Sequence, residues 1–445
     1  MILLCGCADK SNQSSTSSSS SAESSSSAED TVTTPEATAT VAPKYNYVHG
    51  TDGYYNLAEE LKYFKMNNQY SGTCWLYAAS ASMSSAYERE TGKELNIDVP
   101  DLLEFIYGDD KQEGIFIADG VTKSELGGYQ GFVTERLSGG YRDGITLVSS
   151  MVIDPADREA VKNVVKTRGG VAAIICDRNV EQKRYGDYLT VNYNQAEVYD
   201  HYVTIIGWDD HFPKEYFKVP ATEDGAWIVY NSNINGGYYY ISYCSTFDHV
   251  ISHMVSDIYS EVLSYDAGNE LDTYVKTGDS TKVASVFHKE GKLSAVGTFN
   301  DFDRQDIKIE IMSADFGKVL YTQEATLDYQ GYHTVQLSTP VEVNDFAVVI
   351  TYTKGAPVEG ESIDTVVGSY KTSIEKGQSF VFADGKWKDM SDEDIKTVLT
   401  TGKGRSVYFS ENGMWKDFLN ETEAEPLFTT DFAPGNCCIK ALFQG

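Results

Sequence analysis

Cys74 is the residue best placed to do chemistry in this sequence of 445 residues. It follows the polar run 67–73. The segment that it opens has apolar or small residues at every fourth position, which predicts a helix from Cys74 to about Glu90. A cysteine at the start of a helix lies near the positive end of the helix dipole and beside backbone N–H groups. Both lower the pKa of the thiol and favour the thiolate, so we expect Cys74 to be a nucleophile.

A cysteine nucleophile needs a base, which must come from a distant part of the chain that folds back against the helix. His201 opens the apolar run Tyr202–Ile206, a predicted strand that would hold the imidazole rigidly. Asn231 follows a second predicted strand, Ala226–Tyr230, where its amide could bind the other ring nitrogen and select the tautomer. The sequence therefore predicts Cys74, His201 and Asn231 as a catalytic set.

These residues belong to three ordered motifs that resemble the papain superfamily of cysteine peptidases. The motifs are Gly72-Thr73-Cys74-Trp75, Asp200-His201 leading into Ile206-Gly207-Trp208, and Trp227-Ile228-Val229-Tyr230-Asn231-Ser232 followed by Gly237-Tyr238-Tyr239-Tyr240-Ile241. The resemblance covers about residues 45 to 259. It implies an α+β, papain-like, two-lobed catalytic domain in which a helical lobe carries the cysteine and a β-barrel lobe carries the histidine and asparagine.

The resemblance also implies supporting residues around this set. The family's oxyanion glutamine usually lies six residues before the cysteine, whereas Gln69 lies five before Cys74 and Asn68 lies six before it. Gln69 is the expected oxyanion-hole residue, and Asn68 remains an alternative. We expect Gly72 to let the chain turn sharply into the helix; Trp75 and Asp200 are further supporting residues, with Asp200 tuning the histidine.

One position departs from the family pattern. The family commonly has a tryptophan two residues after the catalytic asparagine, packed over the hydrogen bond between asparagine and histidine. Here that position is Asn233. The departure predicts a less shielded pair and slower catalysis.

The pattern of the chain changes along its length. Residues 102–150 are predicted to form helical pieces separated by glycine pairs. From about Leu263 onward the chain consists of many short strand-like runs separated by turns, which predicts an all-β sandwich domain.

Three fragments of this β-rich part, Leu293–Gly297, Gly377–Phe380 and Cys438–Ala441, resemble parts of the lectin-like domain that accompanies a bacterial branch of papain-like peptidases. This resemblance implies glycan contact through the C-terminal domain. We therefore expect an N-terminal tether over residues 1–44, a peptidase domain over residues 45–262 and a lectin-like domain over residues 263–445.

The first seven residues resemble the end of a bacterial lipoprotein signal, in which Cys7 would be lipidated. The next segment, from Ser11 to about Ala42, is dominated by Ser, Thr, Ala and Glu, a composition typical of a flexible tether. No stretch approaches the roughly 20 apolar residues of a membrane-spanning helix. The sequence predicts an extracellular protein, lipid-anchored to the outer face of a bacterial membrane and in contact with the membrane only through that anchor.

Composition argues against several other classes of function. The net charge of -30 disfavours nucleic acid as a partner, because nucleic-acid binding depends on clustered Lys and Arg. The seven cysteines lack the spacing of a disulfide framework or a zinc site. His249 and His253 stand four residues apart, and the loop Asn300–Asp303 is rich in acid, but neither has the ligand pattern of a known metal site. We expect no metal and no cofactor.

The motifs predict a cysteine-type endopeptidase that hydrolyses peptide bonds of extracellular proteins through an acyl-enzyme. Its partners would be protein or peptide substrates. The main alternative is a catalytically impaired papain-like surface protein that acts as an adhesion module or binds glycans or proteins. Acyl transfer to an acceptor other than water is a third hypothesis, because it uses the same residues.

Overall fold

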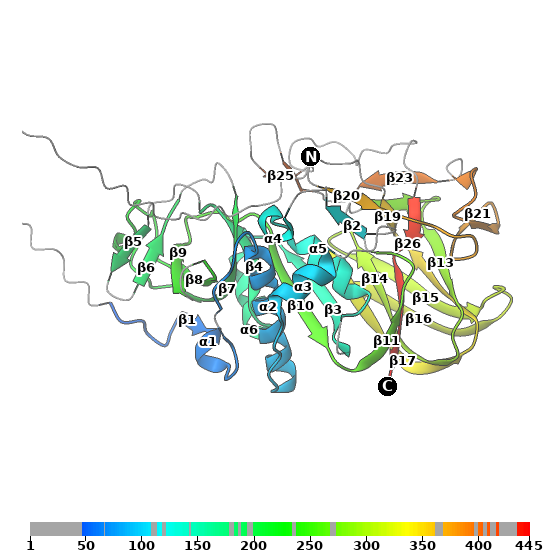
Figure 1. The fold of residues 1–445 in the computed structure, drawn as a ribbon, viewed down its shortest axis with the longest axis horizontal. Helices are drawn as coiled ribbons and strands as arrows, with labels where there is room; N and C mark the ends of the chain where they lie inside the picture. Colours follow the sequence, from blue (N-terminus) through cyan, green and yellow to red (C-terminus); the bar gives the residue numbers. More distant parts are fainter. Residues whose placement is uncertain are drawn as a thin grey trace, which may run out of the picture.

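The computed structural model describes residues 47–65, 67–107, 114–117, 122–141, 144–177, 182–185, 188–193, 199–233, 237–267, 273–360, 368–395, 399–403, 407–409, 415–417 and 434–445. Cys7 and the Ser-rich segment therefore lie outside the described residues. Figure 1 shows an elongated molecule, with an N-terminal half of helices and strands beside a C-terminal half of strands. The N-terminal half ends with the strand that closes at Ser256, and the C-terminal half begins with the strand that opens at Tyr259.

The helices in the described part of the chain all belong to the N-terminal half. They are α1 (Leu57–Glu60), α2 (Cys74–Thr91), α3 (Val99–Ile106), α4 (Lys123–Leu126), α5 (Gln130–Ser138) and α6 (Arg158–Thr167). The helix expected from Cys74 is confirmed as α2, which ends at Gly92 in the left-handed conformation favoured by glycine. None of these helices combines the length and hydrophobicity needed to cross a bilayer.

A single 13-stranded sheet runs through both halves, in the order β11-β27-β14-β17-β3-β10-β4-β7-β8-β9-β6-β5, with β1 also paired to β7. In the N-terminal half its strands are β1 (Tyr54–Asn56), β3 (Thr146–Ile153), β4 (Val171–Ile175), β5 (Gln182–Tyr185), β6 (Tyr188–Val191), β7 (His201–Asp209), β8 (Ala226–Asn231), β9 (Gly237–Ser242) and β10 (Val250–Ser256). In the C-terminal half they are β11 (Tyr259–Leu263), β14 (Gly291–Asn300), β17 (Gly331–Val343) and β27 (Ile439–Gln444).

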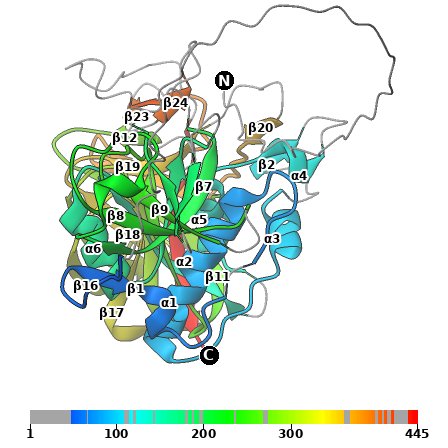
Figure 2. The same ribbon diagram turned by 90° about the vertical axis from the view of Figure 1, so that its left-hand side faces the viewer.

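Helices cover both faces of the sheet in the N-terminal half, as the end-on view in Figure 2 shows for α2 and α6. Strand β4 is buried throughout. Its residues Ala172 and Ile174 pack in the core that contains α2, and Ala173 packs in the core that contains α6. A strand covered on both faces needs apolar residues at every position, which explains its uninterrupted run of Val, Ala and Ile.

The short strands expected from about Leu263 onward are present, and three sheets of the C-terminal half contribute to one core. The second sheet contains β13 (Thr281–Phe287), β15 (Gln305–Ser313), β16 (Val319–Leu327), β18 (Phe346–Tyr352), β21 (Ser379–Ala383) and β22 (Lys386–Asp389). A four-stranded sheet contains β12 (Thr273–Lys276), β19 (Ala356–Gly360), β23 (Thr400–Lys403) and β26 (Pro434–Cys437). Val283, Ile309 and Val348 of the second sheet share a core with Val296 and Ile439 of the long sheet.

The two halves meet along strands β3 and β17, which pair through one residue each, Ser149 and His333. They also share a core, because Tyr332 and Cys438 pack in the same cluster as Trp75. A further link is the two-stranded sheet of β2 (Gly114–Ile117) and β20 (Gly368–Lys371); β24 (Val407–Phe409) pairs with β25 (Trp415–Asp417) elsewhere. The halves are therefore joined by backbone pairing and by a common core.

One expectation about the N-terminal half is wrong in part. The sequence predicts helical pieces between residues 102 and 150, and α3, α4 and α5 fall in this range, but Thr146–Ile153 is strand β3. Its place between β10 and β17 in the sheet stabilises the extended conformation. These partners come from distant parts of the chain, so local residue spacing carries no sign of them.

Candidate active site

Cys74 is the first residue of α2 and is fully buried. Helix α2 packs along β7: the Thr204 hydroxyl donates to the Ala78 carbonyl over 3.4 Å. Further along α2, the Ser85 hydroxyl accepts the N–H of Gly170. Gly170 precedes Val171, which pairs antiparallel with Ile205, so this second contact lies beyond Ile205 along β7. The two contacts advance in the same direction along helix and strand. Cys74 and His201, the first residues of α2 and β7, therefore lie at the same end of the packed pair.

His201 and Asn231 are joined directly. The Nε2 atom of His201 lies 2.9 Å from Oδ1 of Asn231, and both side chains are buried. Oδ1 also accepts the backbone N–H of Asn233, over 2.9 Å, so the amide oxygen is the atom that faces the ring. An oxygen can only accept, which puts the hydrogen on Nε2 and leaves Nδ1 as the basic nitrogen of a neutral imidazole.

The strands explain how this pair is built. His201 begins β7, opposite Ile175 at the end of β4, and Asn231 ends β8, which is the other neighbour of β7. Asn233 is exposed and does not cover the pair, yet His201 and Asn231 are buried. Slower catalysis stays a prediction. Shielding here does not depend on the side chain two positions after the asparagine.

Gln69 is attached to the residue that follows Asn231. Its backbone N–H donates to the Ser232 carbonyl over 2.9 Å, and its Oε1 accepts the Ser232 hydroxyl over 2.8 Å. The remaining side-chain atom, Nε2, donates to the Ser71 carbonyl over 3.0 Å. By contrast, the neighbouring Asn68 is exposed. The structure thus brings Gln69 against the end of β8, close to the histidine and asparagine.

The turn between Gln69 and Cys74 differs in detail from the expectation for Gly72. The left-handed residue is Ser71, with φ 50°, whereas Gly72 does not have positive φ. Gly72 is required for space, because a Cβ there would lie 2.9 Å from the Ser124 carbonyl oxygen. The Gly72 N–H donates to the same oxygen, which ties the turn to α4.

Trp75 and Asp200 each hold one of the elements that carry the candidate site. Trp75 is fully buried against the rings of Tyr107 and Phe132 and leaves no room for a side chain at Gly128. The carboxylate of Asp200 accepts the backbone N–H of Asp177 over 2.8 Å, which fastens the start of β7 to the chain after β4. Trp75 thus packs the first turn of α2, and Asp200 braces the strand that carries His201.

Sequence reasoning missed Ser232. The sequence did indicate where the Ser232 side chain points. Side chains alternate along a strand, so the residue after an asparagine that faces the histidine must face the other way. What the sequence alone could not reveal is the segment found on that other side. Among the described residues, no group of three or more His, Cys, Asp or Glu is arranged to hold a metal ion.

Comparisons with known proteins place the fold. Residues 264–400 match the protein family described as Lectin like domain. The clostridial cysteine protease Cwp84, after propeptide cleavage, is 15% identical, with a TM-score of 0.60 over 87% of this chain and 98% of that chain. A structure of the cysteine protease and lectin-like domains of Cwp84, described as a surface layer associated protein of Clostridium difficile, is 16% identical, with a TM-score of 0.61 over 89% of each chain. No curated protein matches.

The chain has the fold of a cysteine protease joined to a lectin-like domain. At this level of identity the likeness concerns the fold alone.

Proposed function

We propose that this protein is a cysteine-type endopeptidase that hydrolyses peptide bonds of extracellular proteins through Cys74, His201 and Asn231. The observation that carries the proposal is the 2.9 Å contact from His201 Nε2 to Asn231 Oδ1, at the start of β7, a strand that packs against α2 through the bond between Thr204 and Ala78. This contact selects the tautomer in which Nδ1 takes up a proton from a thiol. The helix dipole at Cys74 favours the resulting thiolate.

The reaction follows from this arrangement. The Cys74 thiolate attacks the carbonyl carbon of the scissile peptide bond, and the protonated His201 gives its proton to the leaving amine. Water then loses a proton to His201 and attacks the acyl-enzyme, which releases the carboxylic acid and restores the thiolate. Asn231 holds the imidazole in one orientation throughout, so proton transfer needs no rotation of the ring.

Gln69 is the residue we assign to the oxyanion hole. A side-chain amide has two N–H donors, and one of those on Gln69 is directed at Ser71. The second is proposed to bind the tetrahedral oxyanion together with the backbone N–H of Cys74. Ser232 supports this assignment, because its two hydrogen bonds orient the Gln69 amide, whereas the side chain of Asn68 is exposed.

The remaining parts of the chain are proposed to place this site on its targets. We assign residues 45–262 to a papain-like domain of two lobes and residues 263–445 to the lectin-like domain, which would contact surface glycans or proteins. Cys7 would carry a lipid, and residues 1–44 would tether the enzyme outside a bacterial membrane. The fold shared with Cwp84, whose description is a surface layer associated protein, supports a surface location.

Hydrolysis of an unstructured protein substrate tests the proposal. The wild-type chain should cleave it, and both Cys74→Ala and His201→Ala should lose at least about a hundredfold in kcat, the lower bound for loss of a nucleophile or base. Cys244→Ala serves as the matched control. It makes the same substitution at a half-buried cysteine that is distant from α2 in the sequence. Equal cleavage by Cys74→Ala and wild type would contradict the proposal. Adding a peptide amine as acceptor separates hydrolysis from transfer, because transfer yields a ligated product.

A second candidate function has its own supporting observation. Cys74 is fully buried, so a substrate reaches the thiol only after the covering atoms move. A protein that never opens would act as a binding module, with the C-terminal half making the contacts. Binding of cell-surface glycans or proteins by a Cys74→Ala chain, together with absence of cleavage by the wild type, would favour this function.

A further inference from the structure

We propose that Tyr230 is a positioning residue that holds the segment 67–69 in register with Asn231, so that Gln69 meets the developing oxyanion. This inference rests on the proposed function. It concerns a residue one position before the catalytic asparagine that touches the loop rather than the reacting atoms.

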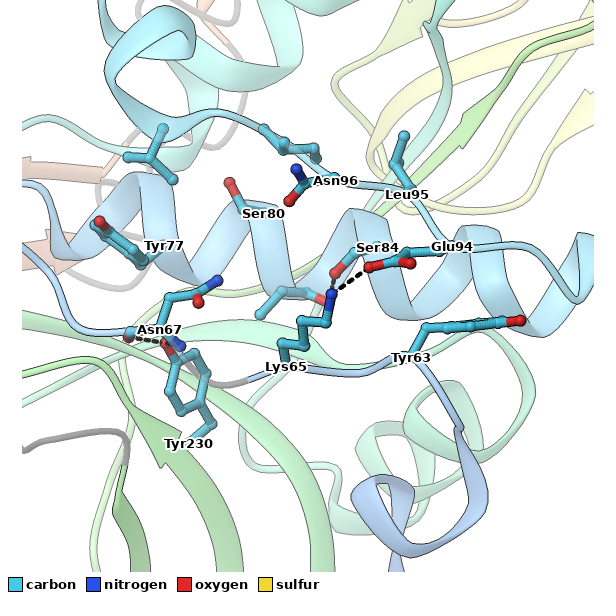
Figure 3. Close-up of a pocket in the computed structure, with 13 residues that line it drawn as sticks. Tyr63, Lys65, Asn67, Tyr77, Ser80, Ser84, Glu94, Leu95, Asn96 and Tyr230 are labelled. Atoms are coloured by element: carbon cyan, nitrogen blue, oxygen red, sulfur yellow. Dashed lines mark hydrogen bonds and ion pairs between the residues drawn. The ribbon is translucent and has the colours of Figure 1, made fainter.

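The contact is a closed pair of hydrogen bonds. The hydroxyl of Tyr230 accepts the backbone N–H of Asn67 over 2.7 Å and donates to the carbonyl oxygen of the same residue. Figure 3 shows the Tyr230 ring beside Asn67. A phenol hydroxyl can accept and donate at once, and here it uses both capacities on one residue of the loop. Asn67 is therefore fixed in position and in orientation.

The Tyr230 side chain, the anchor of this loop, is itself held by packing. The Tyr230 side chain is buried in a core with Ile206 and Phe212, and its ring meets Phe64 edge to face at 6.2 Å between centroids. Burial raises the pKa of Tyr230 to about 12, although the bond with Asn67 opposes the shift. The hydroxyl thus stays protonated, and the bond that it donates persists, over the whole range in which a thiolate enzyme works.

The end of β8 divides its side chains between two tasks. Asn231 faces the imidazole of His201. Tyr230 and Ser232, on the other side of the strand, bind Asn67 and Gln69. Alternate residues of one strand thus engage alternate residues of the loop. Two anchors two residues apart fix the register of the loop, and this explains how a glutamine only five residues before the cysteine is held at the site.

The consequence for catalysis is specific. Oxyanion donors act only as charge develops on the carbonyl oxygen, so a displaced Gln69 should lower kcat more than it raises KM. Alkylation of Cys74 by iodoacetamide forms no such oxyanion at the attacked carbon. The rate of alkylation and its pH profile depend on the ionisation of the Cys74 thiol and of His201. The Tyr230 hydroxyl binds Asn67 and neither of these groups. The two measurements therefore separate positioning of the loop from general damage to the site.

The test compares the full-length wild type with Tyr230→Phe, which removes only the hydroxyl. Tyr63→Phe is the matched control. Tyr63 lines the pocket of Figure 3 together with Asn67 and Tyr230, but its hydroxyl binds the exposed Lys62 and not the loop. We expect kcat of Tyr230→Phe to fall by about tenfold to a hundredfold, less than the full loss of an oxyanion donor. Its KM should stay within about twofold of wild type, and its alkylation profile should not change. An unchanged kcat, or an equal fall in the alkylation rate, would overturn the proposal.

A double-mutant cycle with Gln69→Ala tests the route of the effect. If Tyr230 acts through Gln69, Tyr230→Phe should cost nothing further in the Gln69→Ala chain, and additive losses would overturn the proposal. Amide hydrogen exchange on the wild type needs no variant: the N–H groups of Asn67 and Gln69 should be protected, and rapid exchange at Asn67 would contradict the anchor. A wild type without turnover overturns the proposed function and this inference together, whereas an active wild type matched by Tyr230→Phe overturns this inference alone.

Discussion

The Oδ1 atom of Asn231 accepts two donors, the His201 ring and the Asn233 backbone N–H, and this gives the residue its orienting role. The second donor holds the amide so that its oxygen, and not its nitrogen, meets the imidazole. A flipped amide would present Nδ2 to the ring and favour the opposite tautomer. The backbone turn after β8 therefore helps to decide which ring nitrogen of His201, the proposed catalytic base, carries the hydrogen.

Neighbouring amides at positions 68 and 69 allow a direct test of the oxyanion assignment. Gln69→Ala should lower kcat by about a hundredfold to a thousandfold, the usual effect of losing one oxyanion donor, with little change in KM. Asn68→Ala removes an exposed side chain and should leave kcat unchanged. Steady-state kinetics on a peptide substrate decides between them. The reverse result, with Asn68→Ala impaired and Gln69→Ala active, would refute the assignment.

At the scale of the element, the turn from Gln69 into α2 depends on space for the chain at Gly72. A methyl group there would lie 2.9 Å from the Ser124 carbonyl oxygen, a backbone atom that cannot step aside alone. Gly72→Ala should therefore lower the free energy of unfolding by about 1–3 kcal/mol, as overpacking does.

Gly139→Ala is the matched control, because the nearest atom to a Cβ there is 3.9 Å away and φ is -82°. Thermal unfolding followed by circular dichroism compares the two variants with the wild type. Equal midpoints for Gly72→Ala and Gly139→Ala would show that α4 yields to the added methyl group.

The elements around the site were predictable where their signal is local. The helix from Cys74 rests on apolar spacing that buries Trp75, Ala79, Met83 and Tyr87, and the strands from His201 and before Asn231 rest on short β-rich runs. The positive φ of Ser71 and the bonds of Ser232 were not predictable. Each depends on segments far apart in the sequence that meet only after folding.

At the scale of the whole molecule, a polar cluster lies where the two halves meet. The rings of Tyr329 and His333 stack at 4.0 Å, the Arg168 guanidinium lies 5.3 Å from the centre of the Tyr329 ring, and the Tyr329 and Ser149 hydroxyls are 2.6 Å apart. His333 Nε2 lies 2.8 Å from the Tyr329 carbonyl oxygen. Burial lowers the pKa of His333 to about 4, and the charge of Arg168 adds to this. The imidazole is therefore neutral in the folded protein at pH 7.

This pKa predicts that acid weakens the fold. An unfolded histidine takes up a proton near its ordinary pKa of about 6.5, whereas folded His333 resists protonation down to about pH 4. Its contribution to stability is complete above pH ~6.5 and falls, by up to about 3 kcal/mol, as the pH drops from there toward 4. Denaturant unfolding across this range should show a shallower loss for His333→Gln than for wild type. The exposed His288 provides the control, and the same slope in His333→Gln and His288→Gln would contradict the prediction.

The central claim is that the buried Cys74 is an activated nucleophile, and the most direct measurement is labelling with an epoxide inhibitor of papain-like enzymes, followed by mass mapping of the modified residue. Cys244 is an internal comparison: partial burial would raise the pKa of its thiol, but hydrogen bonds from Thr222 lower it overall, and it is more accessible than Cys74. We predict modification of Cys74 alone, with loss of peptide turnover in proportion to labelling. Modification of Cys244 with Cys74 left unmodified would contradict the account.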